Sequence, residues 1–301
     1  MVCMNLKDYL NNLEISEELV SVILSLFDAI KDISKAILET DVDKAGTENV
    51  YGESQLDIDV VSDNLIADHC KKNPLIGLIA SEERPDEERL SDGEFAVCYD
   101  PLDGSSLIDV NLAVGSIFGI YEKESFIGVT GDDQVAAVAS VYGPRTTVAL
   151  TVGRGVVVFM LNSAGEFEIH KDNLQITEGK MFAPGNLRAC AKREDYLDLV
   201  NFWCKEQYTL RYSGGMVPDV NQILLKGKGI FAYPAYEDAP EGKLRLLFEC
   251  APLALIMEQA GGAASSGKQR ILSLNVEKIN QRTPIFIGSK LEVERCKKML
   301  A

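Results

Sequence analysis

Apolar residues near the start of the chain recur at helical spacing. They occupy every third or fourth position from Leu19 to Ile37, and this period predicts an amphipathic helix. Ser16, followed by Glu17 and Glu18, is typical of a helix start because a hydroxyl caps the first turn and acidic residues favour it. A second helix is predicted over 60–72. Residues 40–55 are polar and contain glycine, which indicates a mobile loop between the two helices.

Short apolar runs in the middle of the chain predict strands. The runs over 75–80 and 95–99 have the length of buried strands, and each is followed by carboxylates. Further runs follow one another with short turns, which favours an antiparallel meander. These runs lie near 115–121, 135–142, 146–152, 155–161 and 166–169.

Beyond about residue 179 the pattern changes to alternating helices and strands. Pro218 and Pro252 suit the first turns of two helices, and Gly261 suits the end of the second. Other helices are predicted over 194–206 and 289–300, and strands over 230–233 and 283–287. We therefore expect an α+β protein with an N-terminal domain over 1–178 and a C-terminal α/β domain over 179–301.

Composition and charge narrow the class of protein. Among 301 residues, 46% are hydrophobic and 25% charged, which is typical of soluble globular proteins. No apolar run approaches the roughly 18 residues that span a bilayer, and no secretory signal is evident, so we expect a cytoplasmic protein without a membrane partner. The net charge of −16 argues against nucleic-acid binding. Seven widely spaced cysteines argue against a disulfide framework or a CxxC motif.

Carboxylates at strand ends are the strongest candidate chemistry. Two histidines are too few for a histidine-rich metal site, and GxSxG, Walker A and GxGxxG motifs are absent. Glu82-Glu83 and Asp100-x-x-Asp103 both follow apolar strands, and converging carboxylates favour a hard cation such as Mg²⁺. Either motif by itself is more often a solvated surface or a turn. The continuation Gly104-Ser105-Ser106, which can bind a phosphate through backbone N–H groups, makes the combination more specific.

The segment from Asp100 to Ser106 resembles the hallmark motif of the lithium-sensitive, metal-dependent phosphatases, which include inositol monophosphatases and fructose-1,6-bisphosphatases. Ile108-Asp109 narrows the resemblance to the bisphosphatases, whose fold is a layered α-β-α-β-α sandwich. Within that branch, several segments resemble the sedoheptulose-1,7-bisphosphatases. They lie at 133–137, 142–147, 179–189, 208–212 and 281–283.

The resemblance implies a role for each matching residue. Asp59 and Glu83 would take a proton from the attacking water, and Glu53 would complete the closed site. Arg211 would reach a neighbouring subunit's site, which implies a homodimer or homotetramer. The implied metal ligands are Glu82, Glu83, Asp100, the Leu102 carbonyl, Asp103 and Glu249. Gly104 and Ser105 would hold the scissile phosphate, and Asn186, Tyr212, Tyr233 and Lys243 the distal phosphate and sugar.

The implied reaction is Mg²⁺-dependent hydrolysis of the 1-phosphate of sedoheptulose 1,7-bisphosphate, with two or three metal ions and Mn²⁺ as a substitute. The alternative is fructose-1,6-bisphosphatase activity, alone or in addition, because the two substrates differ by one hydroxymethylene unit. Two other classes are a catalytically silent sugar-phosphate sensor and a structural protein. The intact set of carboxylates argues against the sensor, and the structural protein predicts that nothing depends on Asp100 or Glu249.

Overall fold

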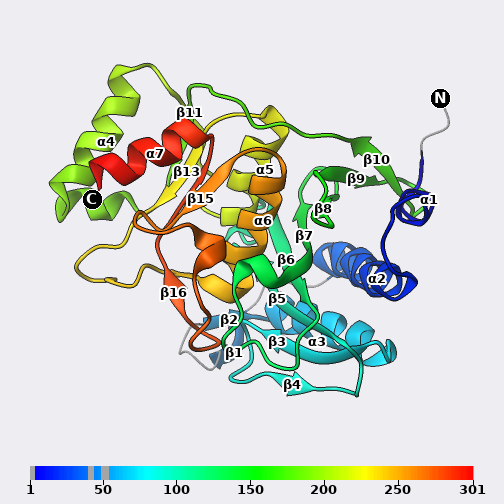
Figure 1. Cartoon of the computed structure of the whole chain (residues 1–301). Helices are drawn as coiled ribbons and strands as arrows, with labels where there is room; N and C mark the ends of the chain where they lie inside the picture. Colours follow the sequence, from blue (N-terminus) through cyan, green and yellow to red (C-terminus); the bar gives the residue numbers. More distant parts are fainter. Residues whose placement is uncertain (1–3, 40–43, 49–53, 301) are drawn as a thin grey trace.

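The computed structural model describes residues 4–39, 44–48 and 54–300. Its helices and sheets alternate in five layers (Figure 1). Three clusters of buried apolar residues lie between successive layers. The arrangement confirms the predicted α+β sandwich, and the predicted boundary at 178/179 stays a prediction.

The first layer consists of N-terminal helices. These are α1 (Leu6–Asn11), α2 (Glu17–Glu39) and α3 (Asp57–Lys72). The predicted stripe of α2 is buried against the first sheet, and the Leu19 N–H donates to the Ser16 hydroxyl at 3.1 Å, which confirms the predicted helix start. In the segment predicted as a loop, the described residues instead form two short antiparallel strands, β1 (Lys44–Glu48) and β2 (Ser54–Leu56).

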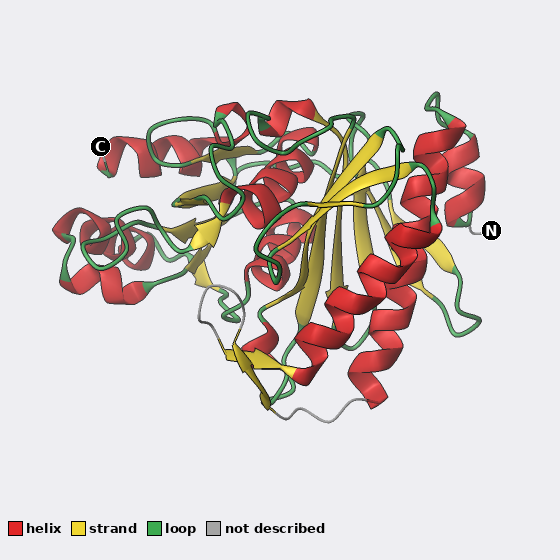
Figure 2. Ribbon diagram, turned by 90° about the horizontal axis from the view of Figure 1, so that it is seen from below, coloured by secondary structure: helices red, strands yellow, loops and turns green. Residues whose placement is uncertain are grey.

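The second layer is an eight-stranded sheet in the order β10-β9-β8-β7-β6-β5-β3-β4. From β5 onward the strands form the predicted antiparallel meander, while β3 and β5 are parallel. Figure 2 shows the helices of the first layer lying across this sheet. The strands are β3 (Ile76–Ser81), β4 (Glu88–Arg89), β5 (Phe95–Asp103), β6 (Val114–Tyr121), β7 (Gln134–Tyr142), β8 (Thr147–Thr151), β9 (Val157–Leu161) and β10 (Phe167–Lys171).

The remaining layers surround a five-stranded mixed sheet in the order β12-β11-β13-β17-β15. Helices α5 (Met216–Lys226) and α6 (Ala251–Gln259) pack between the two sheets, and α4 (Glu194–Lys205) and α7 (Lys290–Met299) cover the outer face. Successive strand residues point to opposite faces. The strands of this sheet contribute to the apolar cluster around α5 and α6 and to the one beneath α4 and α7, so both faces of the sheet are apolar. Its strands are β11 (Met181–Pro184), β12 (Thr209–Leu210), β13 (Ile230–Tyr233), β15 (Ala263–Ser265) and β17 (Ile285–Gly288).

A short two-stranded ribbon is separate from the two large sheets. Strands β14 (Leu244–Arg245) and β16 (Arg282–Thr283) pair antiparallel, and a π-helical turn, Leu246–Cys250, leads from β14 into α6. Pro252 lies in the first turn of α6, as predicted. Among the described helices, none has both the length and the apolar character needed to cross a membrane.

Candidate active site

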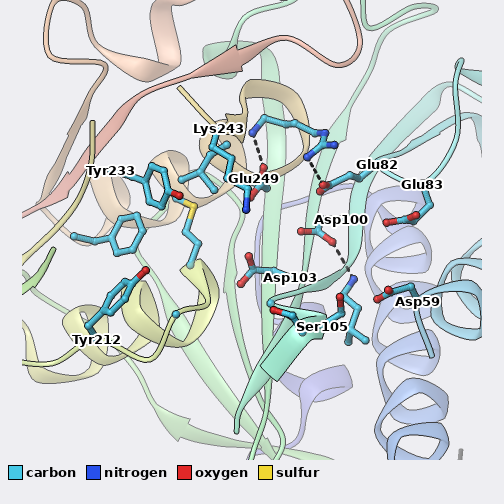
Figure 3. Close-up of a pocket in the computed structure, with 18 residues that line it drawn as sticks. Asp59, Glu82, Glu83, Asp100, Asp103, Ser105, Tyr212, Tyr233, Lys243 and Glu249 are labelled. Atoms are coloured by element: carbon cyan, nitrogen blue, oxygen red, sulfur yellow. Dashed lines mark hydrogen bonds and ion pairs between the residues drawn. The ribbon is translucent and has the colours of Figure 1, made fainter. Parts of the chain in front are cut away.

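A cavity of about 470 Å³ lies between the end of β5, the β14 segment and the loop before α5 (Figure 3). Most of the residues singled out from the sequence line it. Its walls are formed by Asp59, Glu82, Glu83, Asp100, Leu102, Asp103, Gly104, Ser105, Ser106, Tyr212, Gly214, Met216, Phe231, Tyr233, Lys243, Leu244, Arg245 and Glu249.

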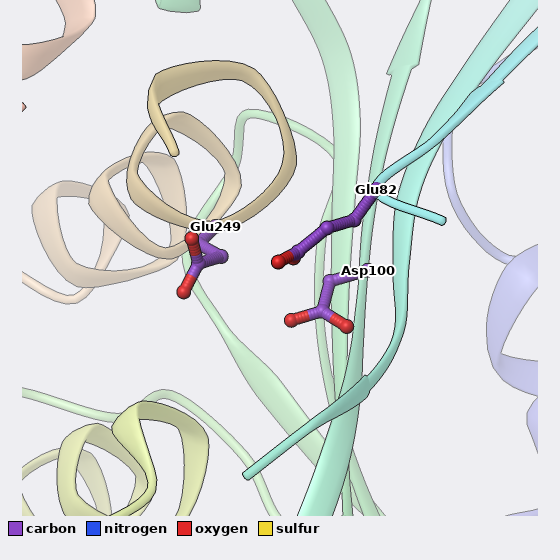
Figure 4. Close-up of side chains that lie close together, drawn as sticks. All are labelled: Glu82, Asp100 and Glu249. Carbon is purple, nitrogen blue, oxygen red and sulfur yellow. The ribbon is translucent and has the colours of Figure 1, made fainter. Parts of the chain in front are cut away.

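Three carboxylates converge in one wall of this cavity (Figure 4). Glu82 follows β3, and its N–H donates to the Tyr99 carbonyl at 3.1 Å, so the pairing with β5 continues into the carboxylate segment. Asp100 belongs to β5 itself, and Glu249 comes from the π-helical turn. One oxygen from each of the three carboxylates lies within 4.8 Å of the other two. Turns of this helix type are frequent at functional sites because they reorient a side chain.

The end of β5 is held in place by polar contacts. The Leu102 N–H donates to Asp100 Oδ1 at 2.9 Å, and the buried Ser116 hydroxyl donates to the Pro101 carbonyl at 2.7 Å. The Val217 N–H at the start of α5 donates to Asp103 Oδ2 at 2.7 Å. These contacts leave little freedom for the two aspartates, which face the cavity.

Gly104 makes the turn that follows the two aspartates. Its φ is +76°, in the left-handed region that costs glycine little. A Cβ at this position would lie 3.2 Å from the Gly215 Cα, so the two loops touch backbone to backbone. The Gly104 turn therefore lies directly against the loop that precedes α5.

Burial and mutual repulsion raise the pKa values of the clustered carboxyls. For Asp100, burial is the largest cause, followed by the charges of Glu82, Asp103 and Glu249, and its pKa is well above the ordinary value. Burial raises the pKa of Asp103 to about 7, although the Val217 N–H opposes the shift. Burial and the charge of Glu82 likewise raise the pKa of Glu249. The cluster as folded therefore favours added positive charge.

Arg245 supplies part of that charge, and the sequence analysis gave it no role. Its side chain is 3% exposed, and its Nη1 lies 2.5 Å from Glu82 Oε1. Its backbone N–H donates to Glu249 Oε2 at 2.5 Å. The available signal was a charged residue inside the apolar run Leu244 to Cys250, because a charge in such a run is buried only with a partner.

The donor set fits a hard divalent cation. Three carboxylate oxygens within 4.8 Å of one another, with no sulfur or imidazole in the cluster, are the ligands that Mg²⁺ and similar ions prefer. Glu82, Asp100 and Glu249 would hold such an ion. Asp103 lines the same cavity but lies outside this group of three.

Asp59 and Glu83 lie beside the cluster on the cavity wall (Figure 3). Asp59 is in the first turn of α3 and is 5% exposed, while Glu83 follows Glu82 directly and its N–H donates to the Ser81 hydroxyl at 3.2 Å. The structure therefore brings these two carboxylates to the cavity, as the sequence analysis expected. Glu53, the third acidic residue predicted for catalysis, lies outside the described residues.

Two tyrosines, Tyr212 and Tyr233, occupy the end of the cavity away from Asp59 and Glu83 (Figure 3). Tyr233 packs on Gly185, where a Cβ would lie 2.5 Å from the tyrosine ring. Burial raises the pKa of Tyr212, while a backbone hydrogen bond with Asn186 lowers it. Lys243 lines the cavity between these tyrosines and Glu249 (Figure 3). Of the remaining predicted substrate residues, Asn186 has a left-handed backbone at φ +54° next to this end, but it does not line the cavity.

Arg211 is exposed and also does not line the cavity of its own chain. Its backbone N–H donates to the Phe182 carbonyl at 2.9 Å, just beyond β12. The side chain is therefore displayed at the surface beside the cavity.

The layered fold and the carboxylate-lined cavity agree with the class of metal-dependent phosphatases that the sequence motif resembles. The comparison with family models agrees with this class. The model of the fructose-1-6-bisphosphatase N-terminal domain matches residues 4–172, and that of the C-terminal domain matches residues 176–301. The chain belongs to the fructose-1,6-bisphosphatase family.

Individual relatives cover nearly the whole chain. A fructose-1,6-bisphosphatase class 1 from Geobacter metallireducens is 44% identical over 96% of this chain and 93% of its own length. A chloroplastic sedoheptulose-1,7-bisphosphatase from Triticum aestivum is 41% identical over 98% of this chain and 76% of its own. A crystal structure from Toxoplasma gondii, provisionally assigned as a sedoheptulose-1,7-bisphosphatase, has a TM-score of 0.93 at 35% identity and 98% coverage of both chains.

Proposed function

We propose that this enzyme hydrolyses the 1-phosphate of sedoheptulose 1,7-bisphosphate, giving sedoheptulose 7-phosphate and inorganic phosphate, with Mg²⁺ as its metal. The observation that carries the proposal is the cavity itself. One end holds Glu82, Asp100 and Glu249 within 4.8 Å of one another, and the other holds Tyr212 and Tyr233, with Lys243 between the tyrosines and Glu249. Such a cavity suits a substrate that has a scissile phosphate at one end and a second anionic group at the other.

In the proposed reaction, Glu82, Asp100 and Glu249 hold the metal, with Asp103, Glu83 and the Leu102 carbonyl as further ligands. When bound, Mg²⁺ would neutralise the phosphoryl oxygens, lower the pKa of a water and stabilise the leaving oxygen. Gly104 and Ser105 would orient the scissile phosphate through backbone N–H groups. Because the Gly104 turn touches the loop before α5, the phosphate position would be fixed relative to both halves of the molecule.

Proton removal is assigned to the pair Asp59 and Glu83. Both carboxylates line the cavity beside the cluster, and Asp59 is held on the rigid first turn of α3. A general base must lie within hydrogen-bond reach of the proton it takes. The water attacking the phosphorus would lie between this pair and the scissile phosphate.

The distal end of the cavity is assigned to the second phosphate and the sugar. Lys243 provides a positive charge, and the phenols of Tyr212 and Tyr233 provide donors. Arg188, at the surface in the turn after Asn186, lowers the pKa of the Tyr233 hydroxyl through its charge, against the larger effect of burial. This additional cation beside the distal end favours a longer substrate. The identities to the wheat enzyme and the Toxoplasma structure support the same choice.

The alternative substrate is fructose 1,6-bisphosphate, either alone or alongside the seven-carbon sugar. The 44% identity to the Geobacter enzyme favours it. One added hydroxymethylene unit changes binding by only about 1–3 kcal/mol, so one polar cavity can accept both substrates.

The test is phosphate release with Mg²⁺ from both bisphosphates, measured side by side as kcat/KM. We expect a higher kcat/KM for sedoheptulose 1,7-bisphosphate. Comparable values would show a dual-specificity enzyme, and a higher value for fructose 1,6-bisphosphate would contradict the proposed substrate. Arg188→Ala is the matched variant, because losing the added cation should reduce the value for the seven-carbon sugar more.

A further inference from the structure

Asp219 is a fully buried carboxylate that does not line the cavity. It lies in the first turn of α5, is 0% exposed and accepts hydrogen bonds with both oxygens. The Ser213 N–H lies 2.9 Å from Oδ1 and 3.1 Å from Oδ2, and Gln222 Nε2 lies 3.0 Å from Oδ1. A buried carboxylate is costly unless it is hydrogen-bonded, so these contacts offset part of the cost of burying Asp219.

The loop that Asp219 holds joins the two ends of the cavity. Tyr212 contributes to the distal end, while Gly214 lines the cavity and Gly215 touches Gly104 at the phosphate-binding turn. Ser213 is the residue between Tyr212 and Gly214. Its bond to Asp219 therefore fixes the middle of the loop whose two ends contact the two proposed phosphate subsites.

Other residues of α5 hold the same loop at further points. Gln222, one turn after Asp219, also donates to the Arg211 carbonyl at 3.3 Å. The Val217 N–H donates to Asp103 at the end of β5. The helix thus acts as one rigid support for the distal loop and for the carboxylate end of the cavity.

A carboxylate in this place has an electrostatic disadvantage for an enzyme with an anionic substrate. The charge of Asp219 raises the pKa values of Tyr212 and Asp103, after the larger effect of burial. An amide could accept from Ser213 with one oxygen only, and its NH₂ group would face the same N–H. The two-oxygen contact therefore explains why an acidic residue suits this position despite its charge.

We propose that Asp219 is a positioning residue that sets the spacing between the two phosphate subsites and thereby the length of bisphosphate the enzyme prefers. The inference rests on the proposed function for its substrates. It adds to that function one residue, Asp219, that would set the preferred length of the substrate without contacting metal or substrate. Rigid support of contact residues is the general route by which a buried neighbour controls specificity.

The test compares wild type and Asp219→Asn on three substrates. These are sedoheptulose 1,7-bisphosphate, fructose 1,6-bisphosphate and fructose 1-phosphate, which has the scissile end only. We expect KM for the preferred bisphosphate to rise about tenfold, as for loss of a hydrogen bond to a charged group. The ratio of kcat/KM between the two bisphosphates should move toward 1, while hydrolysis of fructose 1-phosphate should remain at the wild-type rate.

Two further variants keep the test decisive. Gln222→Ala is the variant to use if Asp219→Asn does not fold. It removes one support of the loop and leaves the Ser213 contact, so it should shift the ratio in the same direction by less. Glu292→Gln is the matched control, because Glu292 is a buried carboxylate in the first turn of α7 that accepts from Trp203 Nε1 at 2.8 Å and from the Tyr208 hydroxyl at 2.7 Å, and it does not line the cavity. It should lower stability and leave the ratio unchanged.

The outcomes separate this inference from the proposed function. An unchanged ratio in Asp219→Asn, or an equal loss of activity on all three substrates, would overturn the positioning role. A wild-type preference for the six-carbon sugar would overturn the proposed substrate. The positioning role would then still be decided by whether the variant changes the ratio.

Discussion

Asp103 ends β5 with one carboxylate oxygen bonded to the backbone of α5 and with its charge in a cavity of other carboxylates. Burial raises its pKa to about 7, so the ionised form is disfavoured in the fold by itself. A carboxyl group whose ionised form is disfavoured in the folded protein is typical of a functional site, where a bound ligand favours the ionised form. The geometry of Asp103 therefore suits a role in activity more than one in stability.

We predict that Asp103→Asn lowers kcat by about a thousandfold, because the lost charge stabilises the metal-bound transition state by several kcal/mol. The Val217 N–H keeps an acceptor in this variant, so the metal-free Tm should not fall. Phosphate release and thermal unfolding without metal would check the two parts. Turnover near the wild-type rate would contradict the role of Asp103 in metal binding.

Arg245 is a residue of the site that the sequence pattern did not predict. The carboxylates were predicted to lie together because they follow strands or match segments of a known family. The structure places Glu82, Asp100 and Glu249 together. The contact of Arg245 with Glu82 joins residues far apart in sequence. No local period indicates such a pair, so only the three-dimensional packing revealed it.

The segment after β3 is tied to α3 by an ion pair one turn beyond Asp59. Arg84 Nε lies 2.9 Å from Asp63 Oδ2, and its Nη1 lies 2.5 Å from Glu88 Oε2. Arg84 directly follows Glu83, and Asp63 lies on α3 one turn after Asp59. The pair therefore holds the two elements that carry the proposed proton acceptors.

Replacing Arg84 tests this connection between elements. Arg84→Met should lower the free energy of unfolding by about 2 kcal/mol, because Asp63 is buried and would lose a charged partner. It should also reduce kcat more than it raises KM. Urea unfolding and steady-state kinetics are the measurements.

Lys71→Met is the control for that experiment. Lys71 pairs with the same Glu88 at 3.1 Å but is far more exposed than Arg84. An exposed pair contributes only about 0–1 kcal/mol, so this variant should resemble wild type. Equal effects of the two substitutions would show that Arg84 does not act through Asp63.

Element positions were predicted well where the apolar period was clear and poorly where function shapes the backbone. The meander and the start of α2 match the prediction. Strand β5 continues past Tyr99 to Asp103, although Asp100 and Pro101 indicated a loop. Tertiary pairing with β6 and the Ser116 bond to Pro101 hold this stretch extended, and neither contact is visible in a local pattern.

At the scale of the whole molecule, 46 acidic and 30 basic residues give a net charge of −16. An anionic substrate must therefore meet a local concentration of cations. Lys243 provides one inside the cavity, and exposed Arg211 lies beside it on the surface. We propose that Arg211 completes the site of a neighbouring subunit in a homodimer or homotetramer.

Mixing two impaired variants, with substrate below KM, would test that assembly. Arg211→Ala should raise KM about tenfold by removing a charged contact with phosphate. When it is mixed under subunit exchange with Asp103→Asn, hybrid assemblies would contain a site with both Asp103 and the neighbour's Arg211. Activity should then exceed the sum of the separate variants. A purely additive result would place Arg211 in the site of its own chain or outside any site.

The origin of the clustered carboxylates has a consequence for stability. Glu82 follows β3 and Asp100 belongs to β5 of the eight-stranded sheet, whereas Glu249 comes from the turn that leads into α6. An ion bound by all three would join distant parts of one chain in the folded state, and would stabilise that state by binding to it and not to the unfolded chain. Chelation would then withdraw this contribution from three distant segments at once, and the resistance of the fold to heat would depend on the concentration of free metal.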